Sequence, residues 1–192
     1  MQVMGIAGIC PKRNLSKADK THEIYPYLLK GLTITKPNQV WETDITYIKM
    51  VKGFCYLTAI LDWFSRYVVS WEISATMEKE FCMTSLRSAL KRVSPEIHNS
   101  DQGSQFTSKE YLALLEAQKI MISMDGRGRC MDNIFTERLW KSVKYEEVYL
   151  KEYRTMEEAR EGLMDYFPFY NEKRRHQGLK DKTPAEVYYA GH

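Results

Sequence analysis

The chain lacks the features that mark membrane, secreted and zinc-binding proteins. Within its 192 residues no apolar run approaches the ~18 residues that a membrane span needs. The start is short of basic residues and has no cleavage-site pattern, which argues against a signal peptide. The four cysteines form no C-x-x-C pair and the four histidines no H-x-x-x-H pair, so neither a zinc site nor a disulfide framework is indicated. We therefore expect reduced thiols, no membrane partner and a cytoplasmic protein.

The sequence also has little net charge. Its 28 Lys and Arg residues against 25 Asp and Glu residues leave only +3, so the placement of the basic residues must decide whether nucleic acid is a partner. A hydrophobic fraction of 44% and a charged fraction of 28% are typical of a globular protein with a real core. The length suits one domain with a short extra segment at one end.

Two regions of the chain differ in character. Residues 1–35 include the polar, basic stretch Pro11–Thr21, which has no clear periodicity and predicts a linker. Lys36–Gln39 predicts a turn before the first strongly patterned segment. We therefore expect a linker over residues 1–35 and a folded core over residues 36–192.

Hydrophobic patterning in the core predicts a succession of strands and helices. Strands are expected at 40–50, 53–61, 66–73, 96–100 and 120–124. Helices are expected at 79–93, after a cap at Ser108, at 131–149 and at 155–171. Short links between the first three strands favour an antiparallel meander. The expected fold is α/β, a mixed five-stranded sheet with flanking helices.

Three acidic residues fall at positions that suit a shared site. Asp44 lies in the first predicted strand, Asp101 at the C-terminal end of the fourth, and Glu137 early in the helix that follows the basic loop 125–129. Adjacent strands place two carboxylates side by side, and a crossing helix brings the third. Mg²⁺ and Mn²⁺ prefer such oxygen ligands. Two of these ions, roughly 3.5–4 Å apart, support phosphodiester cleavage and transfer.

Each acid alone has a simpler explanation. An Asp in a strand is commonly a buried partner of a basic or hydroxyl group. An Asp before Gln-Gly is commonly a turn former, and a helical Glu is commonly solvated surface. Only the joint placement of Asp44, Asp101 and Glu137 favours a catalytic site.

Basic residues near Glu137 fit a phosphate-bearing substrate. Lys141 and Lys144 share a helical stripe with Glu137, and Arg127 and Arg129 precede it on a glycine-containing loop. The alternative is ordinary i,i+4 pairing of Glu137 with Lys141. A DNA backbone running over the site would equally use these cations.

A second basic cluster, Lys173–His176, follows the last long predicted helix. Arg174 and Arg175 lie in it, and two interpretations stay open. The cluster is either complementary to the helix dipole or a second contact with DNA phosphates.

These motifs resemble a known family when they are taken together and in order. The chain is similar to the retroviral-integrase-like catalytic core of bacterial insertion-sequence transposases of the IS-three group. The resemblance covers roughly residues 36–190. The matching stretches are Gln39–Ile48, Tyr56–Asp62 with Ser65 and Arg66, Asn99–Ser108, Ser123–Arg129, Asp132 and Asn133, Glu137–Trp140, Lys144–Glu146, and Tyr170 through Arg175 and His176 to Pro184.

The resemblance implies a ribonuclease-H-like fold and a D-D-35-E triad at Asp44, Asp101 and Glu137, with thirty-five residues between the last two. It further implies two Mg²⁺ or Mn²⁺ ions and strand transfer of element ends into target DNA. A homo-oligomer on DNA and a helix-turn-helix partner from the same element are also expected. Asp62 falls at a usually acidic position outside the triad, for which we expect a structural role.

The chain departs from the family at its start. Only Met4–Arg13 resembles the tail of the DNA-binding region that relatives carry before the core. We therefore expect residues 1–35 to contain a remnant of that region, in an N-terminally shortened chain.

Three functional hypotheses follow. The first is an active transposase core that cuts and joins DNA. The second is a catalytically incomplete DNA-binding or regulatory fragment, supported by the short N-terminal region. The third is a structure-specific nuclease with the same carboxylate chemistry. The basic stretch 127–144 and the matching C-terminal stretch favour the first.

Overall fold

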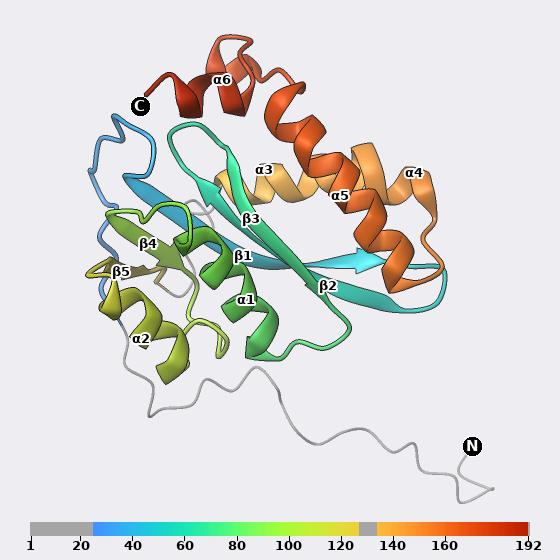
Figure 1. The fold of residues 1–192 in the computed structure, drawn as a ribbon, viewed down its shortest axis with the longest axis horizontal. Coiled ribbons are helices and arrows are strands. Elements are labelled where there is room, and N and C mark those ends of the chain that lie inside the picture. Colours follow the sequence, from blue (N-terminus) through green and yellow to red (C-terminus); the bar gives the residue numbers. More distant parts are fainter. Residues whose placement is uncertain (1–24, 127–133, 192) are drawn as a thin grey trace, which may run out of the picture.

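A mixed five-stranded sheet forms the centre of the computed structural model, which describes residues 25–126 and 134–191 (Figure 1). The spatial order of its strands is β3-β2-β1-β4-β5. The strands are β1 Val40–Lys49, β2 Phe54–Asp62, β3 Val68–Ser74, β4 Ile97–Ser100 and β5 Met121–Met124. All five predicted strands are present, within two residues of the predicted bounds.

The sheet combines an antiparallel half with a parallel half. β1, β2 and β3 form the predicted meander, with Asp44 opposite Ala59 across the first pair. β4 runs parallel to β1, and β5 runs parallel to β4. Because parallel neighbours end at the same edge, the residues that follow β4 and β5 emerge side by side.

Helices cover both faces of this sheet. They are α1 Lys79–Leu90, α2 Lys109–Ala117, α3 Ile134–Val143, α4 Tyr149–Lys151, α5 Met156–Glu172 and α6 Pro184–Tyr189. Ser108 precedes α2 as expected, but its hydroxyl donates to the carbonyl of Gln105 and does not cap the helix. α6 begins with a capping box between Thr183 and Glu186.

Two hydrophobic cores result, one on each face of the sheet. Side chains alternate along β2, so Leu57 and Ala59 face one way and Ile60 the other. The core on the first face lies under α3 and α5 and includes Leu163. The core on the second face lies under α1 and α2 and includes Trp41. β2 therefore contributes to both cores and joins them.

The predicted helix 131–149 is interrupted. After α3 the chain makes a π-helical turn, Lys144–Val148, before α4. The wider turn brings Glu146 to the Tyr166 hydroxyl of α5, at 2.9 Å, and buried Glu147 to the Tyr153 hydroxyl, at 2.5 Å. Two successive side chains thus bond to the segment around α5, a contact that the helical pattern did not predict.

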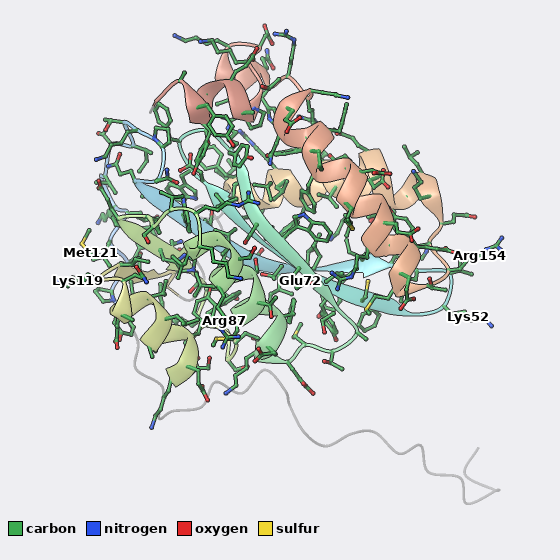
Figure 2. The ribbon with its side chains drawn as sticks, viewed as in Figure 1. Lys52, Glu72, Arg87, Lys119, Met121 and Arg154 are labelled. Atoms are coloured by element: carbon green, nitrogen blue, oxygen red, sulfur yellow. The ribbon has the colours of Figure 1, made fainter. Side chains whose placement is uncertain are left out.

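At one end of the sheet, the segment that precedes α5 is hydrogen-bonded to a hairpin. At the β1–β2 hairpin, the Val51 N–H donates to the Tyr153 carbonyl at 2.7 Å. Figure 2 shows Lys52 and Arg154 at this same end, while Lys119 and Met121 lie at the opposite end.

Residues 25–35 pack against the sheet. Leu29 is buried with Val40 and Ile97, and the Leu28 N–H donates to the Ser123 hydroxyl at 3.0 Å. The expected linker over residues 1–35 is thus packed on the core in its described part, residues 25–35. Of the described residues, no helix combines the length and apolarity that a membrane span requires.

Candidate active site

Three adjoining strands direct acidic side chains to the sheet face that α3 covers. On β1, the side chains of Glu42 and Asp44 point to this face, and those of the residues between and beside them point to the other face. Asn99 of β4 lies opposite Glu42 in the parallel pairing of the two strands. Asp101 and Asp125 immediately follow β4 and β5. The carboxylates of Asp44 and Asp101 therefore gather near the end of the parallel half of the sheet.

Asp44 is half-buried and held by α3. The Trp140 indole N–H donates to its Oδ2 at 2.9 Å. Burial raises the pKa of Asp44 to about 6, against the lowering effect of the Trp140 hydrogen bond, and the negative charges of Asp101 and Asp125 raise it further. This carboxyl is thus close enough to two other acids for their charges to affect its ionisation.

Asp101 begins the loop after β4. Its Oδ1 accepts a hydrogen bond from the Gly103 N–H at 2.8 Å. Although the residue is largely exposed, partial desolvation of the carboxyl raises its pKa, and the Gly103 hydrogen bond opposes that rise. A Cβ at position 103 would lie 2.8 Å from Asp101 Oδ1, so this turn favours glycine.

Glu137 lies in the first turn of α3, three residues before Trp140, and its side chain is exposed. Within residues 25–126 and 134–191, no hydrogen bond joins Glu137 to either aspartate. Nor do three or more Asp, Glu, His or Cys side chains in these ranges converge closely enough to hold a metal. The structure brings Asp44 and Asp101 together and places Glu137 on the helix that crosses them.

Asp125 binds the segment that carries Asp101. Its N–H donates to the Ser100 carbonyl at 2.9 Å. Its Oδ1 accepts from Asn99 Nδ2, and its carbonyl accepts from Gln102 Nε2, both at 3.0 Å. Sequence reasoning assigned Asp125 to a flexible loop. Its position directly after β5, matching that of Asp101 after β4, was the available signal.

Glu42 is a second acid that sequence reasoning missed. It is fully buried, and its Oε2 accepts a hydrogen bond from the Trp63 indole N–H. In the described structure, its Oε1 and the adjacent Asn99 Oδ1 have no hydrogen-bond partner. Burial raises the pKa of Glu42 well above its usual value, and the charges of Asp125 and Asp44 add to the effect. The alternation that places Asp44 on this face also places Glu42 there.

The predicted basic residues are found in different environments. Lys141 is exposed on α3 and Lys144 is half-buried at the start of the π turn. Arg174 donates to both carboxylate oxygens of Glu146, at 2.7 and 2.6 Å. The Arg175 guanidinium donates to the Asp181 carbonyl at 2.8 Å. The remaining predicted contacts lie outside the described residues; these are Arg127 and Arg129, with Asn133 at the expected helix start.

Asp62 has the structural role expected of it. It is buried at the end of β2 and accepts hydrogen bonds from the N–H of Asn38, at 2.7 Å, and from the N–H and hydroxyl of Ser65, at 2.8 and 2.5 Å. Cys55 and Cys82 are free and buried. Cys10 and Cys130 lie outside the described residues.

Comparison with known proteins identifies the fold and the family. Two integrase core domain models match the chain, over residues 34–130 and 118–184. The integrase catalytic core of HTLV-2, described in complex with magnesium, superposes with a TM-score of 0.63 at 20% identity, over 80% of this chain and 97% of that one. A chain of the simian T-cell lymphotropic virus intasome has a TM-score of 0.69, also at 20% identity, over 90% of this chain and 61% of its own. These likenesses confirm the ribonuclease-H-like fold.

Curated relatives are transposases of bacterial insertion elements. The IS629 transposase of Shigella sonnei is 30% identical over 99% of this chain and 67% of its own length. The IS904 transposase of Lactococcus lactis is 35% identical over 79% of this chain and 62% of its own length. The InsF transposase of IS3A from Escherichia coli is 32% identical over 89% and 65%. The chain thus spans about two thirds of the length of these relatives. With an integrase core model matching half of it and this identity along nearly all of it, the chain belongs to the integrase core domain family, among the insertion-sequence transposases of the IS-three group.

Proposed function

We propose that this chain carries the catalytic core of a transposase that cuts DNA phosphodiester bonds and joins element ends to target DNA. Asp44, Asp101 and Glu137 are the proposed catalytic residues and ligands of two Mg²⁺ or Mn²⁺ ions. The observation that supports this most directly is the approach of Asp44 and Asp101 from neighbouring strands under α3, the helix that carries Glu137.

The donor set suits a hard divalent cation. Carboxylate oxygens are the preferred ligands of Mg²⁺ and Mn²⁺. Asp44 and Asp101 both have raised pKa values, chiefly through desolvation, and a bound cation would favour their charged forms. The magnesium described with the HTLV-2 integrase core supports the same class of cofactor. Such ions, when bound, activate the attacking hydroxyl and stabilise the leaving oxygen.

The chain's own residues orient these ligands and the substrate. Trp140 fixes one oxygen of Asp44, and the Gly103 N–H fixes one oxygen of Asp101. Lys141, on the helix of Glu137, and Lys144, at the start of the π-helical turn that follows, provide positive charge for DNA phosphates. The proposed DNA contacts also include Arg127, Arg129, Arg174 and Arg175.

The substrates we propose are the element ends and the target DNA, bound by an oligomer of this chain. The intasome likeness and the dimeric HTLV-2 core support an assembly of several copies. A helix-turn-helix partner from the same element would supply end recognition. We propose that this activity takes place in the bacterial cytoplasm, on the nucleoid, where such DNA substrates lie.

Substitution of Asp101 tests the function. Purified full chain is incubated with labelled element-end DNA and Mn²⁺ or Mg²⁺, and nicked and joined products are counted. Asp101→Asn should reduce both products to background, because it removes a negatively charged oxygen ligand. Asp165→Asn, an exposed acid on α5, is the matched control and should retain activity. Equal activity of wild type and Asp101→Asn would contradict the proposal. Salt-dependent DNA binding without any product would instead favour a regulatory fragment.

A further inference from the structure

Two exposed tyrosines continue the stripe of α3 that carries Glu137. Glu137, Lys141, Tyr145 and Tyr149 follow one another at intervals of four residues. The Tyr145 and Tyr149 side chains are 64% and 52% exposed. Their rings meet edge to face with centroids 5.3 Å apart, so both project from the same side of the helix.

The π-helical turn produces this alignment. Intervals of four residues drift around an α-helix by about 40° each, so a regular helix would turn Tyr149 away from Glu137. The wider turn at Lys144–Val148 offsets that drift. Rare π turns inside α-helices are frequent at functional sites.

The acids of this segment are engaged elsewhere. Glu146 accepts hydrogen bonds from Arg174 and Tyr166, and Glu147 is buried against Tyr153. Among the described residues, Lys141 and Lys144 have no ion-pair partner. The exposed stripe therefore combines two available cations with two aromatic rings.

We propose that Tyr145 and Tyr149 form a stacking surface for unpaired bases of the DNA strand whose phosphates contact Lys141 and Lys144. This surface, the tyrosine shelf, deepens the proposed function and rests on it. Aromatic rings bind any unstacked base through its π-face, and neighbouring lysines hold the backbone. The positive charge beside the rings favours DNA over an apolar protein partner.

The position of the tyrosine shelf defines which bases it reaches. Tyr145 and Tyr149 lie eight and twelve residues beyond Glu137, roughly 12–18 Å along the helix at 1.5 Å per residue. One DNA strand advances about 3.4 Å per nucleotide. The stacked bases should therefore lie about three to five nucleotides from the phosphate that is cut.

The test crosses protein variants with DNA lacking bases. Element-end oligonucleotides with an unpaired strand carry either normal bases or abasic sites at these positions, and their dissociation constants are measured with the full chain. Wild type should bind the abasic strand about tenfold more weakly per lost base. Tyr145→Ala/Tyr149→Ala should bind both strands equally weakly. Tyr145→Phe/Tyr149→Phe keeps both rings and should behave as wild type, as should Tyr47→Ala, which removes a tyrosine of similar exposure on β1.

Three outcomes would overturn the tyrosine shelf. In the first, the alanine pair still distinguishes the two strands as wild type does. In the second, wild type binds both strands equally. In the third, the alanine pair leaves DNA binding unchanged and alters only the oligomer mass measured by analytical ultracentrifugation, which would indicate that the tyrosines contact another protein chain. Failure of the proposed function looks different, because wild type would then bind no DNA or produce no metal-dependent cleavage. The salt dependence gives a further check, since removing tyrosines leaves the slope of log K against log salt unchanged, whereas Lys141→Ala should reduce it.

Discussion

The acidic residues under α3 differ in burial and in hydrogen bonding, and these differences cannot be read from the neighbouring sequence. Glu42 is fully buried and Asp44 half-buried, two residues apart on one strand face. Glu42 has one unsatisfied oxygen, whereas Asp44 has an indole partner and two acidic neighbours. Burial of the charged Glu42 carboxylate therefore lowers the stability of the fold. At Asp44, burial raises the pKa, and a bound cation would stabilise the charged carboxylate.

Glu42→Gln should stabilise the metal-free protein at high pH. The pKa of Glu42 in the folded state is raised above its usual 4.5 by burial. Its contribution to the free energy of unfolding is therefore fully present below pH 4.5, where the carboxyl is neutral in both states, and is lost as the pH rises toward the folded-state pKa. Gln stays neutral, so its advantage should reach about 1–3 kcal/mol at pH 8 and vanish near pH 4. Urea unfolding at both pH values measures it, with the exposed Glu161→Gln as control. An equal gain at both values would contradict this account.

Asp125 should influence activity through Asp101 and Asp44. Asp125→Ala removes the acceptor of the Asn99 amide and should lower metal-dependent cleavage about 10–100-fold, as loss of a ligand-supporting contact does. Asp125→Asn retains an acceptor oxygen and should recover most of that rate. Because the charge of Asp125 raises the pKa of Asp44, the same variant should move the acidic limb of the pH–rate profile to lower pH. This role would be contradicted if the acidic limb of the pH–rate profile moved to higher pH, or if Asp125→Asn cleaved no faster than Asp125→Ala.

Sequence reasoning could place Asp44 and Asp101 on neighbouring strand segments but could not predict the partners of their carboxylates. Asp44 and Asp101 were predicted because strand ends and alternation are local properties. Trp140 binds Asp44 across ninety-six residues, and Asp125 binds Asn99 across twenty-six. Such contacts depend on how α3 crosses the sheet and on which strands are neighbours, and no local pattern encodes either.

Among the helices, α5 lies close to the π-helical turn at Gly162. A Cβ at Gly162 would lie 2.1 Å from the Tyr153 hydroxyl and 2.6 Å from Glu147 Oε1. Glycine inside a helix normally costs about 0.5–1 kcal/mol relative to alanine. Here its absence of a side chain permits the buried hydrogen bond between Tyr153 and Glu147.

Gly162→Ala should consequently destabilise the protein by about 1–3 kcal/mol despite the gain in helix propensity. Tyr153→Phe removes the crowded hydroxyl, so Gly162→Ala should cost less in that background than in wild type. Urea denaturation of the four proteins measures this coupling. Additive effects of the two substitutions would show that the close contact is not the cause.

Elements with strong periodicity were predicted well, and the exception is informative. β1 and α5 begin and end within one residue of the predicted bounds. Residues 131–149 were predicted as one regular helix, whereas the structure has a π-helical turn at Lys144–Val148. This π turn follows from the bonds of Glu146 and Glu147 to the α5 region, which are tertiary contacts.

At the scale of the whole molecule, β2 joins the two hydrophobic cores. We expect the described fold to unfold as one unit. Leu163→Ala, on α5, should destabilise it by about 2–5 kcal/mol through the cavity it leaves. Far-UV circular dichroism and tryptophan fluorescence should still report a single coincident transition, because the tryptophans report on both cores: Trp140 lies in the core of Leu163 and Trp41 in the opposite one. Separate transitions would show that the faces unfold independently.

The overall architecture was predictable to the level of a mixed sheet. The meander follows from short links between β1, β2 and β3. The central position of β1 depends on its parallel pairing with β4, in which Val40 lies opposite Ile97, and the sequence has no local signal for so distant a pairing. This long-range pairing is nevertheless what brings Asp44 beside Asp101.

The π-helical turn has a consequence for how this sequence can change by descent. Deleting one residue from 144–148 would restore regular α-helical geometry and leave Tyr149 eleven residues after Glu137, about 20° from it around the helix. Such a deletion keeps both the reading frame and the side of the helix on which Tyr149 lies. A deletion of equal size in the regular part of α3, between Glu137 and Val143, would instead rotate all that follows by about 100°. In related elements, inherited losses of single codons should therefore be more frequent in the π-helical turn than in the preceding part of α3.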